Sequence, residues 1–294
     1  MEKFGSRSNQ WQKEIQDLIR GASGGFLFGI PLLYTMEVWW IGSSVKMVRL
    51  LLAMIFTLAI VLLLNRTAGF RKAVNTTLQD ECMDTIEAFA IGLVCAGSML
   101  ILLREITWET SLSEALGKLI YESVPFTLGV ALANQFLSGG EEENQTSTNH
   151  RSQRSPHKQN LTLINTFADI GSTLIGAMII AFNIAPTDEV PMLAAAVDGL
   201  WLLGVMAASL VISYTIVFAA GFAKQPKRRQ QQGLFQRPLS ETVMSYLVSL
   251  VAACIMLVFF DKLAWSDPWQ MWLSHSILLG LPATVGGAAG RLAV

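Results

Sequence analysis

Charged residues are scarce in this sequence of 294 residues. Asp, Glu, Lys and Arg make up 15% of it and hydrophobic residues 52%, whereas soluble domains carry roughly 25% charged residues. This balance excludes an ordinary soluble domain and indicates an integral membrane protein. The formal net charge of −1 provides none of the positive excess that binding to nucleic-acid phosphates requires.

Cysteines, histidines and enzyme motifs are equally sparse. The three cysteines, Cys82, Cys95 and Cys254, lie in or beside apolar segments without metal-ligand spacing, so we expect packed thiols and no disulfide framework. No HExxH, GxSxG, Walker or CxxC pattern occurs. We therefore expect neither enzyme activity nor a bound cofactor.

Long apolar runs are what the sequence has in abundance. A helix needs about 20 apolar residues to cross a bilayer, and eight stretches qualify: residues 22–42, 47–65, 84–103, 117–137, 162–185, 192–222, 241–260 and 271–291. The fourth is the weakest, because Lys118 and Glu122 lie in its first turns. The pattern predicts an all-α bundle of eight transmembrane helices.

An internal repeat divides these stretches into four plus four. Residues 84–133 match residues 241–290 at a constant offset of 157, with 13 identities in 50 positions, including Trp108 with Trp265. The earlier helices are less alike: Gly24, Leu27 and Gly29 match Gly171, Leu174 and Gly176 at an offset of 147, and Ala68-Gly69-Phe70 matches Ala220-Gly221-Phe222 at 152. Because each copy has an even number of helices, both should enter from the same side, as parallel repeats.

The distribution of Lys and Arg predicts the orientation. With the N-terminus inside, 16 of these residues fall on the inner side and 5 on the outer side, so we expect both termini to be cytoplasmic. The expected organisation is an interfacial amphipathic helix (1–21), a first repeat (22–137), a disordered cytoplasmic linker (138–160) and a second repeat (161–294). The basic inner loops should contact anionic lipids.

Ionisable side chains inside the apolar stretches are the main candidate functional residues, because such groups are costly there and tend to line ion pathways. Glu37, Asp198 and Glu122 should lie near the outer mouth of a pathway and Asp169 towards the inner side, while Asn183 aligns roughly with Glu37. A structural alternative remains for Glu37, which stands beside Trp39-Trp40 as an interfacial residue would. At Asp84 and Glu241 the alternative is that an acid complements a helix macrodipole.

Prolines at matching positions indicate helix breaks. Pro31 lies in the first stretch, and the pattern Pro-x-Thr-x-Gly recurs as Pro125, Thr127, Gly129 and as Pro282, Thr284, Gly286. Proline frees a carbonyl group, threonine can bond to that carbonyl, and broken helices at symmetric positions are typical of a midplane gate. The alternative is a pair of kinks that fit neighbouring helices together.

The first apolar stretch carries a specific motif, RGASGGFLFGIPLLYTMEVWW, from Arg20 to Trp40. It resembles the opening motif of a family of integral membrane proteins from cyanobacteria and other bacteria. The resemblance implies a bacterial origin and a membrane location, the inner or thylakoid membrane, and it adds no mechanism.

Taken together, these features predict a cation channel or an ion- or proton-coupled transporter that uses membrane-embedded carboxylates. Its partners would be inorganic cations or protons and the lipid bilayer, without nucleic acid, and a homo-oligomer is compatible with the sequence. A protein of another class, a non-transporting membrane sensor or scaffold, stays open as the alternative. The two differ in whether reconstituted protein passes cations.

Overall fold

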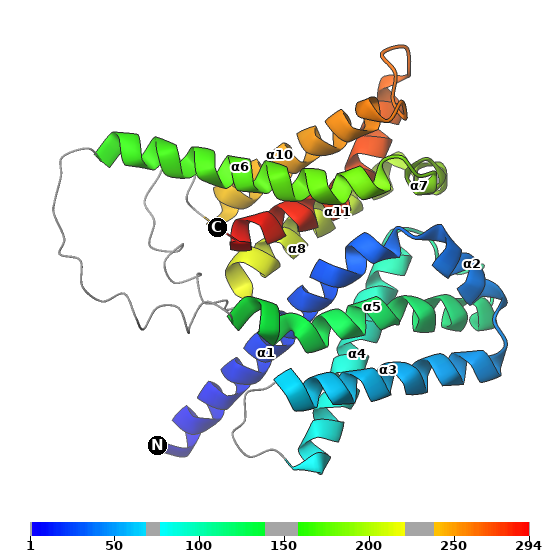
Figure 1. Cartoon of the computed structure of the whole chain (residues 1–294), viewed down its shortest axis with the longest axis vertical. Helices are drawn as coiled ribbons and strands as arrows, with labels where there is room; N and C mark the ends of the chain where they lie inside the picture. Colours follow the sequence, from blue (N-terminus) through cyan, green and yellow to red (C-terminus); the bar gives the residue numbers. More distant parts are fainter. Residues whose placement is uncertain (1, 69–76, 139–157, 221–237, 294) are drawn as a thin grey trace. The chain divides into compact units, whose positions relative to one another are not determined.

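The computed structural model describes residues 2–68, 77–138, 158–220 and 238–293, and the regular secondary structure in these ranges is helical, without strands (Figure 1). The chain divides into two compact units. Unit 1 comprises Met1–Asn134 with Ala219–Gly221, and unit 2 comprises Gln135–Phe218 with Phe222–Val294. Each unit is described below by itself.

The two units contain the same order of elements. The helices that begin in unit 1 are α1 (Glu2–Leu33), α2 (Met36–Ser44), α3 (Met47–Ala68), α4 (Leu78–Leu102) and α5 (Leu112–Ser138). The remaining helices are α6 (Lys158–Ile184), α7 (Glu189–Ala196), α8 (Gly199–Tyr214) with a π-helical turn η2 (Thr215–Ala219), α10 (Pro238–Phe259) and α11 (Trp269–Ala293). In both sets a long helix is followed by a short one and then by three helices of transmembrane length or close to it.

Five helices are long and apolar enough to cross a membrane, and two bent helix pairs raise the number of candidate spans to seven. The five are Met47–Asn65, Leu78–Leu102, Leu112–Ala133, Gly199–Ala219 and Pro238–Phe259. The expected eighth stretch is present as α11 but is not among the candidate spans. It packs against α6, α7, α8 and α10, so other helices of the protein surround much of it.

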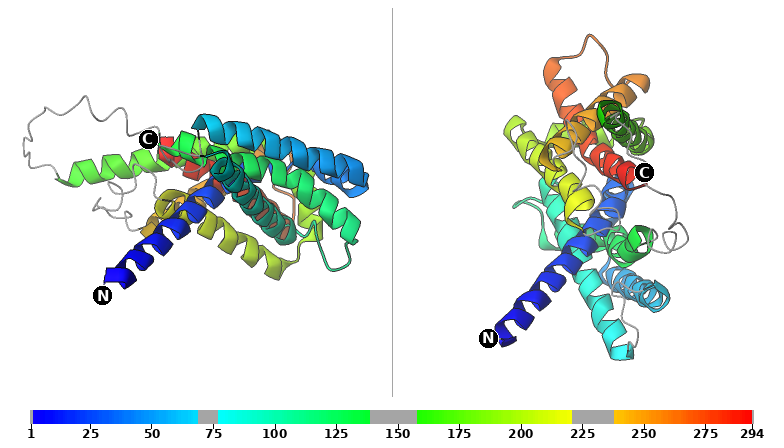
Figure 2. Two further views of the ribbon diagram at one scale, coloured as in Figure 1. Left: turned by 90° about the horizontal axis from the view of Figure 1, so that it is seen from below. Right: turned by 90° about the vertical axis from the view of Figure 1, so that its left-hand side faces the viewer.

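The helices break at positions other than those that the sequence predicts. The interfacial helix over residues 1–21 is not separate, because α1 continues to Leu33 as a single rod (Figure 2). The chain then bends by 89° into α2, and by 88° between α6 and α7. The predicted stretch 192–222 is likewise divided between α7 and α8.

Prolines do not break the two helices in which breaks were expected. α5 runs through Pro125 and α11 runs through Pro282. Pro31 lies inside α1, two residues before that helix ends. The expectation of midplane breaks at Pro125 and Pro282 is therefore wrong. Proline removes one hydrogen bond from a helix and can kink it, but the helix continues beyond it.

Close glycine contacts explain why these helices stay packed. In unit 1 a Cβ atom on Gly24 would lie 2.5 Å from the carbonyl oxygen of Gly129, so α1 and α5 meet backbone to backbone. In unit 2 Gly286 of α11 meets the carbonyl oxygen of Gly176 of α6 in the same way. Glycines at such crossings let helices approach closely, so Gly129 and Gly286 act in packing.

The start of α4 also differs from that of the expected apolar stretch 84–103. α4 begins at Leu78, and Thr77 caps it: Thr77 Oγ1 accepts a hydrogen bond from the N–H of Asp80, whose carboxylate accepts one from the N–H of Thr77. This capping box satisfies amide groups at the first turn, so Asp84 and Glu87 lie inside the helix. Most of the expected linker 138–160 falls outside the described residues.

Candidate functional site

The predicted pathway residues have very different surroundings. Glu122 of α5 is completely buried, and Asp169 of α6 is half-buried. Glu37, in the first turn of α2, and Asp198, immediately before α8, are exposed. Asn183 is also exposed, and its amide donates to the carbonyl oxygen of Ile179 within its own helix. Of the five, Glu122 alone is fully withdrawn from the protein surface.

The Glu122 carboxylate is buried without a hydrogen-bond partner on either oxygen. The indole N–H of Trp39 is the donor that faces it. Trp39 is itself 1% exposed, and its N–H has no hydrogen bond of ordinary geometry. An unpaired buried polar group costs free energy in any protein interior, so this pair of unsatisfied groups calls for a functional explanation.

Short helix α2 brings Trp39 to this position. A Cβ atom on Gly42 would lie 3.0 Å from the carbonyl oxygen of Gly117, so the backbones of α2 and α5 touch there. Residues three apart share one face of a helix, and Trp39 therefore lies on the same face of α2 as Gly42, the face that contacts α5. The bend after α1 thus places an indole against the buried carboxylate.

Lys118 lies one turn before Glu122 on α5 but is engaged elsewhere. Its Nζ donates to the backbone carbonyl of Glu105 at 3.0 Å and to the Glu105 carboxylate at 3.2 Å, and it pairs with the Glu114 carboxylate at 3.1 Å. An ammonium group has three N–H donors, so these acceptors use all of them. The nearby Glu105 carboxylate has the same sign of charge as the Glu122 carboxylate and repels it.

At the aligned positions of the described residues, this arrangement occurs in unit 1 and not in unit 2. At the offset of 157, unit 2 has Leu279 in place of Glu122, His275 in place of Lys118 and Lys262 in place of Glu105. Lys262 instead pairs with Asp188 at 2.8 Å. The buried carboxylate is therefore a feature in which the two halves of the sequence differ.

Unit 2 has a buried ion pair of its own. Arg291, near the end of α11, donates to the Glu241 carboxylate at 3.0 Å and to the Ser213 hydroxyl at 3.3 Å. Arg291 is fully buried and Glu241 is 3% exposed. Glu241 does stand in the first turn of α10, as a residue that complements the macrodipole would. Its carboxylate also binds the Arg291 guanidinium, a partner that no sequence pattern relates to it.

The two repeated threonines act differently from each other. Thr284 donates to the carbonyl oxygen of Gly280 at 2.6 Å, although the carbonyl that Pro282 frees is that of Leu278. The buried Thr127 hydroxyl has no hydrogen-bond partner and packs against Gly92 of α4. Neither threonine bonds to the carbonyl that its neighbouring proline frees.

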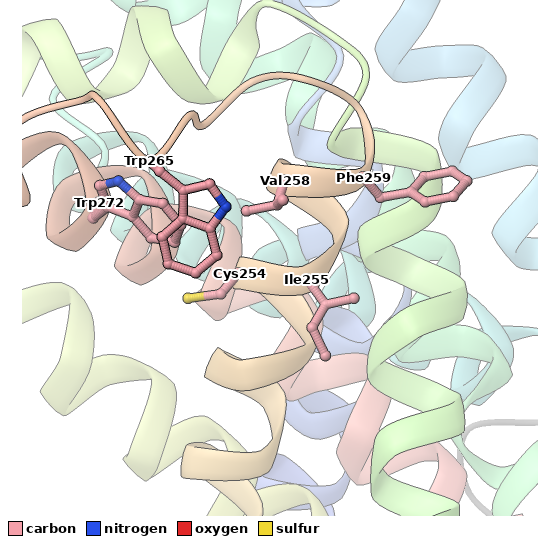
Figure 3. A pocket seen from close by; sticks show the side chains of 6 residues that line it. All are labelled: Cys254, Ile255, Val258, Phe259, Trp265 and Trp272. Carbon is pink, nitrogen blue, oxygen red and sulfur yellow. The ribbon is translucent and has the colours of Figure 1, made fainter.

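A pocket of about 440 Å³ lies in unit 2, between α10 and the start of α11 (Figure 3). Its lining is apolar and consists of Cys254, Ile255, Val258, Phe259, Trp265 and Trp272. The two indoles lie side by side, with ring centroids 5.4 Å apart. None of the predicted pathway residues lines this pocket, and the described residues contain no group of three or more His, Cys, Asp or Glu side chains that could hold a metal ion.

An all-helical chain with five to seven candidate spans is a multi-pass integral membrane protein. The comparison with protein families agrees: the model of the family described as "Putative integral membrane protein (DUF2391)" matches residues 17–294, and the chain belongs to this family. The family has no assigned function. No curated protein and no solved structure matches the chain.

Proposed function

We propose that this protein transports cations across a bacterial membrane, as a channel or as an ion- or proton-coupled carrier. The observation that carries the proposal is Glu122: a carboxylate with no exposed surface and no hydrogen bond of ordinary geometry, inside the candidate span Leu112–Ala133. Ionisable groups at such positions are expensive, and they commonly mark ion pathways and proton relays. A purely structural acid would be expected to have a partner, as Glu241 has in unit 2.

We further propose that the chain consists of two parallel repeats, which together cross the membrane eight times. Supporting this, the loops after α4 and α10 share five backbone hydrogen bonds at the offset of 157; for example, Glu105 N–H donates to Leu100, and Lys262 N–H to Leu257. The contact between Gly24 and Gly129 also recurs between Gly176 and Gly286.

The helix ends revise the alignment of the first helices. α3 begins at Met47 and α8 at Gly199, which is an offset of 152. The same offset aligns Thr35-x-Glu37-Val38 with Thr187-x-Glu189-Val190, at the start of α2 and of α7. The counterpart of Glu37 is then Glu189 rather than Asn183. In this proposed alignment, an offset of 152 replaces the offset of 147 for the first helices. The two bends would each carry an acid in the first turn of the short helix.

In this proposal the exposed acids Glu37 and Asp198 attract cations at the aqueous outer mouth, and Asp169 lies towards the inner side. Both termini are cytoplasmic, in a bacterial inner or thylakoid membrane. The basic cytoplasmic segments contact anionic lipids, and assembly into a homo-oligomer is compatible with this architecture.

Liposome reconstitution tests the proposed function. Full-length protein in vesicles of phosphatidylethanolamine and phosphatidylglycerol should pass at least one of H⁺, Na⁺ and K⁺ faster than protein-free vesicles do. The assay should cover several pH values, because protonation of carboxylates changes their charge. If none of these cations moves under any condition, the transport proposal is wrong.

The alternative is a membrane sensor or scaffold that moves no ions. It is favoured by the exposure of Glu37, Asp198 and Asn183 and by the purely apolar lining of the pocket around Trp265 and Trp272. The reconstitution experiment decides between the two, since a sensor or scaffold leaves the vesicles as tight as protein-free ones.

A further inference from the structure

The surroundings of Glu122 fit one particular cation. We infer that the transported cation is a proton, that Glu122 is the group that binds it, and that Lys118 is the counter-ion of Glu122 after the proton leaves. This inference rests on the proposed transport function and goes beyond it by naming the substrate and the group that carries it.

The ligands around Glu122 are too few for a metal cation. Ca²⁺ binds six to eight oxygen ligands and Mg²⁺ prefers six, and Na⁺ and K⁺ also replace their hydration shells with several oxygens in selective sites. Here one carboxylate supplies two oxygens, and its neighbour Trp39 offers an N–H donor rather than an oxygen. A proton needs only one carboxylate oxygen, so it is the cation that this site can bind completely.

The described arrangement holds Glu122 in its protonated form. A buried carboxylate anion requires a charge partner or several hydrogen bonds, and neither oxygen of Glu122 has a hydrogen bond of ordinary geometry, with Trp39 as the one donor that acts on it. Lys118 directs its three donors to Glu105 and Glu114 instead. Among the described residues, Glu105 of the loop after α4 and Trp39 of α2 act on Glu122, and Lys118 lies one turn earlier on the same helix.

Lys118 is positioned to neutralise Glu122 once the proton leaves. Residues four apart on a helix lie next to each other on one face, so the flexible Lys118 side chain reaches Glu122 by giving up an acceptor on Glu105 or Glu114. In this step the Glu122 carboxyl O–H bond breaks, the proton passes to water, and the carboxylate keeps the electron pair. The Lys118 ammonium stays protonated and supplies the positive charge that the buried anion needs, with the Trp39 N–H as a further donor.

The aligned positions of unit 2 do not form a second site of this kind. Leu279 replaces the acid, and Lys262, at the position of Glu105, pairs with Asp188. A proton-binding carboxylate of this kind thus occurs once in the aligned positions, which implies one proton carried per chain at this site.

Proton flux into vesicles tests the inference directly. Full-length protein is reconstituted with a trapped pH-sensitive dye, and a K⁺ diffusion potential set by valinomycin draws protons in. Wild type should acidify the lumen. Glu122→Gln, which keeps the shape and removes the ionisable group, should lower the rate at least tenfold. Glu109→Gln removes the same charge from an exposed loop position and should leave the rate unchanged.

The outcomes separate this inference from the proposed function. Flux of Na⁺ or K⁺ without H⁺ flux leaves the transport proposal standing and overturns the inference. Proton flux that Glu122→Gln does not slow overturns it as well. Loss of H⁺ flux in Glu122→Gln with normal flux in Glu109→Gln supports it.

A second measurement on the wild type does not depend on how the variant folds. Dicyclohexylcarbodiimide adds to protonated carboxyl groups in apolar surroundings, so mass spectrometry of the labelled membrane protein should find the adduct on Glu122. The exposed Glu109 should remain unlabelled under the same conditions. Labelling should also stop the proton flux, and an unlabelled Glu122 in transporting protein would refute the inference.

Discussion

Arg104 and Asp261 adopt the same left-handed backbone conformation, with φ of 60° and 57°. They occupy equivalent positions at the offset of 157, directly after α4 and α10. At each site the residue's own N–H bonds back three residues and the next N–H bonds back five, from Glu105 to Leu100 and from Lys262 to Leu257. This is the Schellman arrangement that ends many helices, usually with glycine at the left-handed position.

Glycine should therefore make the folded protein more stable than the native residue does at both positions. A non-glycine residue in the left-handed region costs roughly 1–2 kcal/mol, so we expect Arg104→Gly and Asp261→Gly each to stabilise the protein by about 1 kcal/mol. Arg104→Val should destabilise it, since a β-branched side chain fits this conformation poorly. Thermal unfolding of the purified protein in detergent measures these changes. Glu109→Gly is the control, and it should not stabilise, because Glu109 has no positive φ.

The glycine contacts within unit 2 predict opposite effects for two substitutions on α6. A Cβ on Gly176 would collide with the Gly286 carbonyl oxygen, whereas a Cβ on Gly171 meets nothing within 4 Å. Gly176→Ala should destabilise the protein by about 1–3 kcal/mol, the usual range for overpacking. Gly171→Ala should be neutral or stabilising by up to about 1 kcal/mol, because alanine is the better helix former. Equal melting temperatures for the two variants would contradict the close packing of α6 on α11.

A substitution that changes only one partner of the buried ion pair in unit 2 should strongly destabilise the protein. Arg291 and Glu241 are 3.0 Å apart and both buried. Removal of one partner leaves an uncompensated charge and typically costs about 3–5 kcal/mol. We expect Glu241→Gln and Arg291→Met each to lower the melting temperature strongly. The double variant Glu241→Met with Arg291→Met should lose less than the sum of the two, and an additive loss would contradict the pairing.

The helical class and the approximate positions of the helices could be predicted from the sequence, because runs of about 20 apolar residues have few other structures available in a membrane. The helix ends were less accurate, since they depend on local caps. Thr77 extends α4 six residues upstream of Asp84, and α10 begins at Pro238, a residue that favours the first helical turn.

The bends could not be predicted, because proline is a local signal and the bends depend on tertiary packing. Pro125 and Pro282 lie inside continuous helices. The bend after Leu33 instead leads into a short helix that packs through Gly42 on Gly117, two residues that nothing in the sequence relates to each other.

The sequence singles out Glu122 as an acid in an apolar stretch, and the structure shows that it is buried. Its neighbour Trp39 could not be deduced, because 83 residues separate them in the sequence. Glu241 and Arg291 are similarly 50 residues apart. Contacts between distant residues leave no periodic pattern in the sequence.

Cysteine labelling distinguishes parallel from inverted repeats. Trp108 and Trp265 are exposed, equivalent residues in the loops after α4 and α10, and parallel repeats place both loops outside. In a variant without native cysteines, Trp108→Cys and Trp265→Cys should each react with a membrane-impermeant maleimide added to intact cells. Trp11→Cys lies near the N-terminus, which the proposed orientation places in the cytoplasm, and should react only after permeabilisation. If one of the two loops is protected in intact cells and the other is labelled, the repeats are inverted, and the pseudo-twofold axis lies in the membrane plane rather than along its normal.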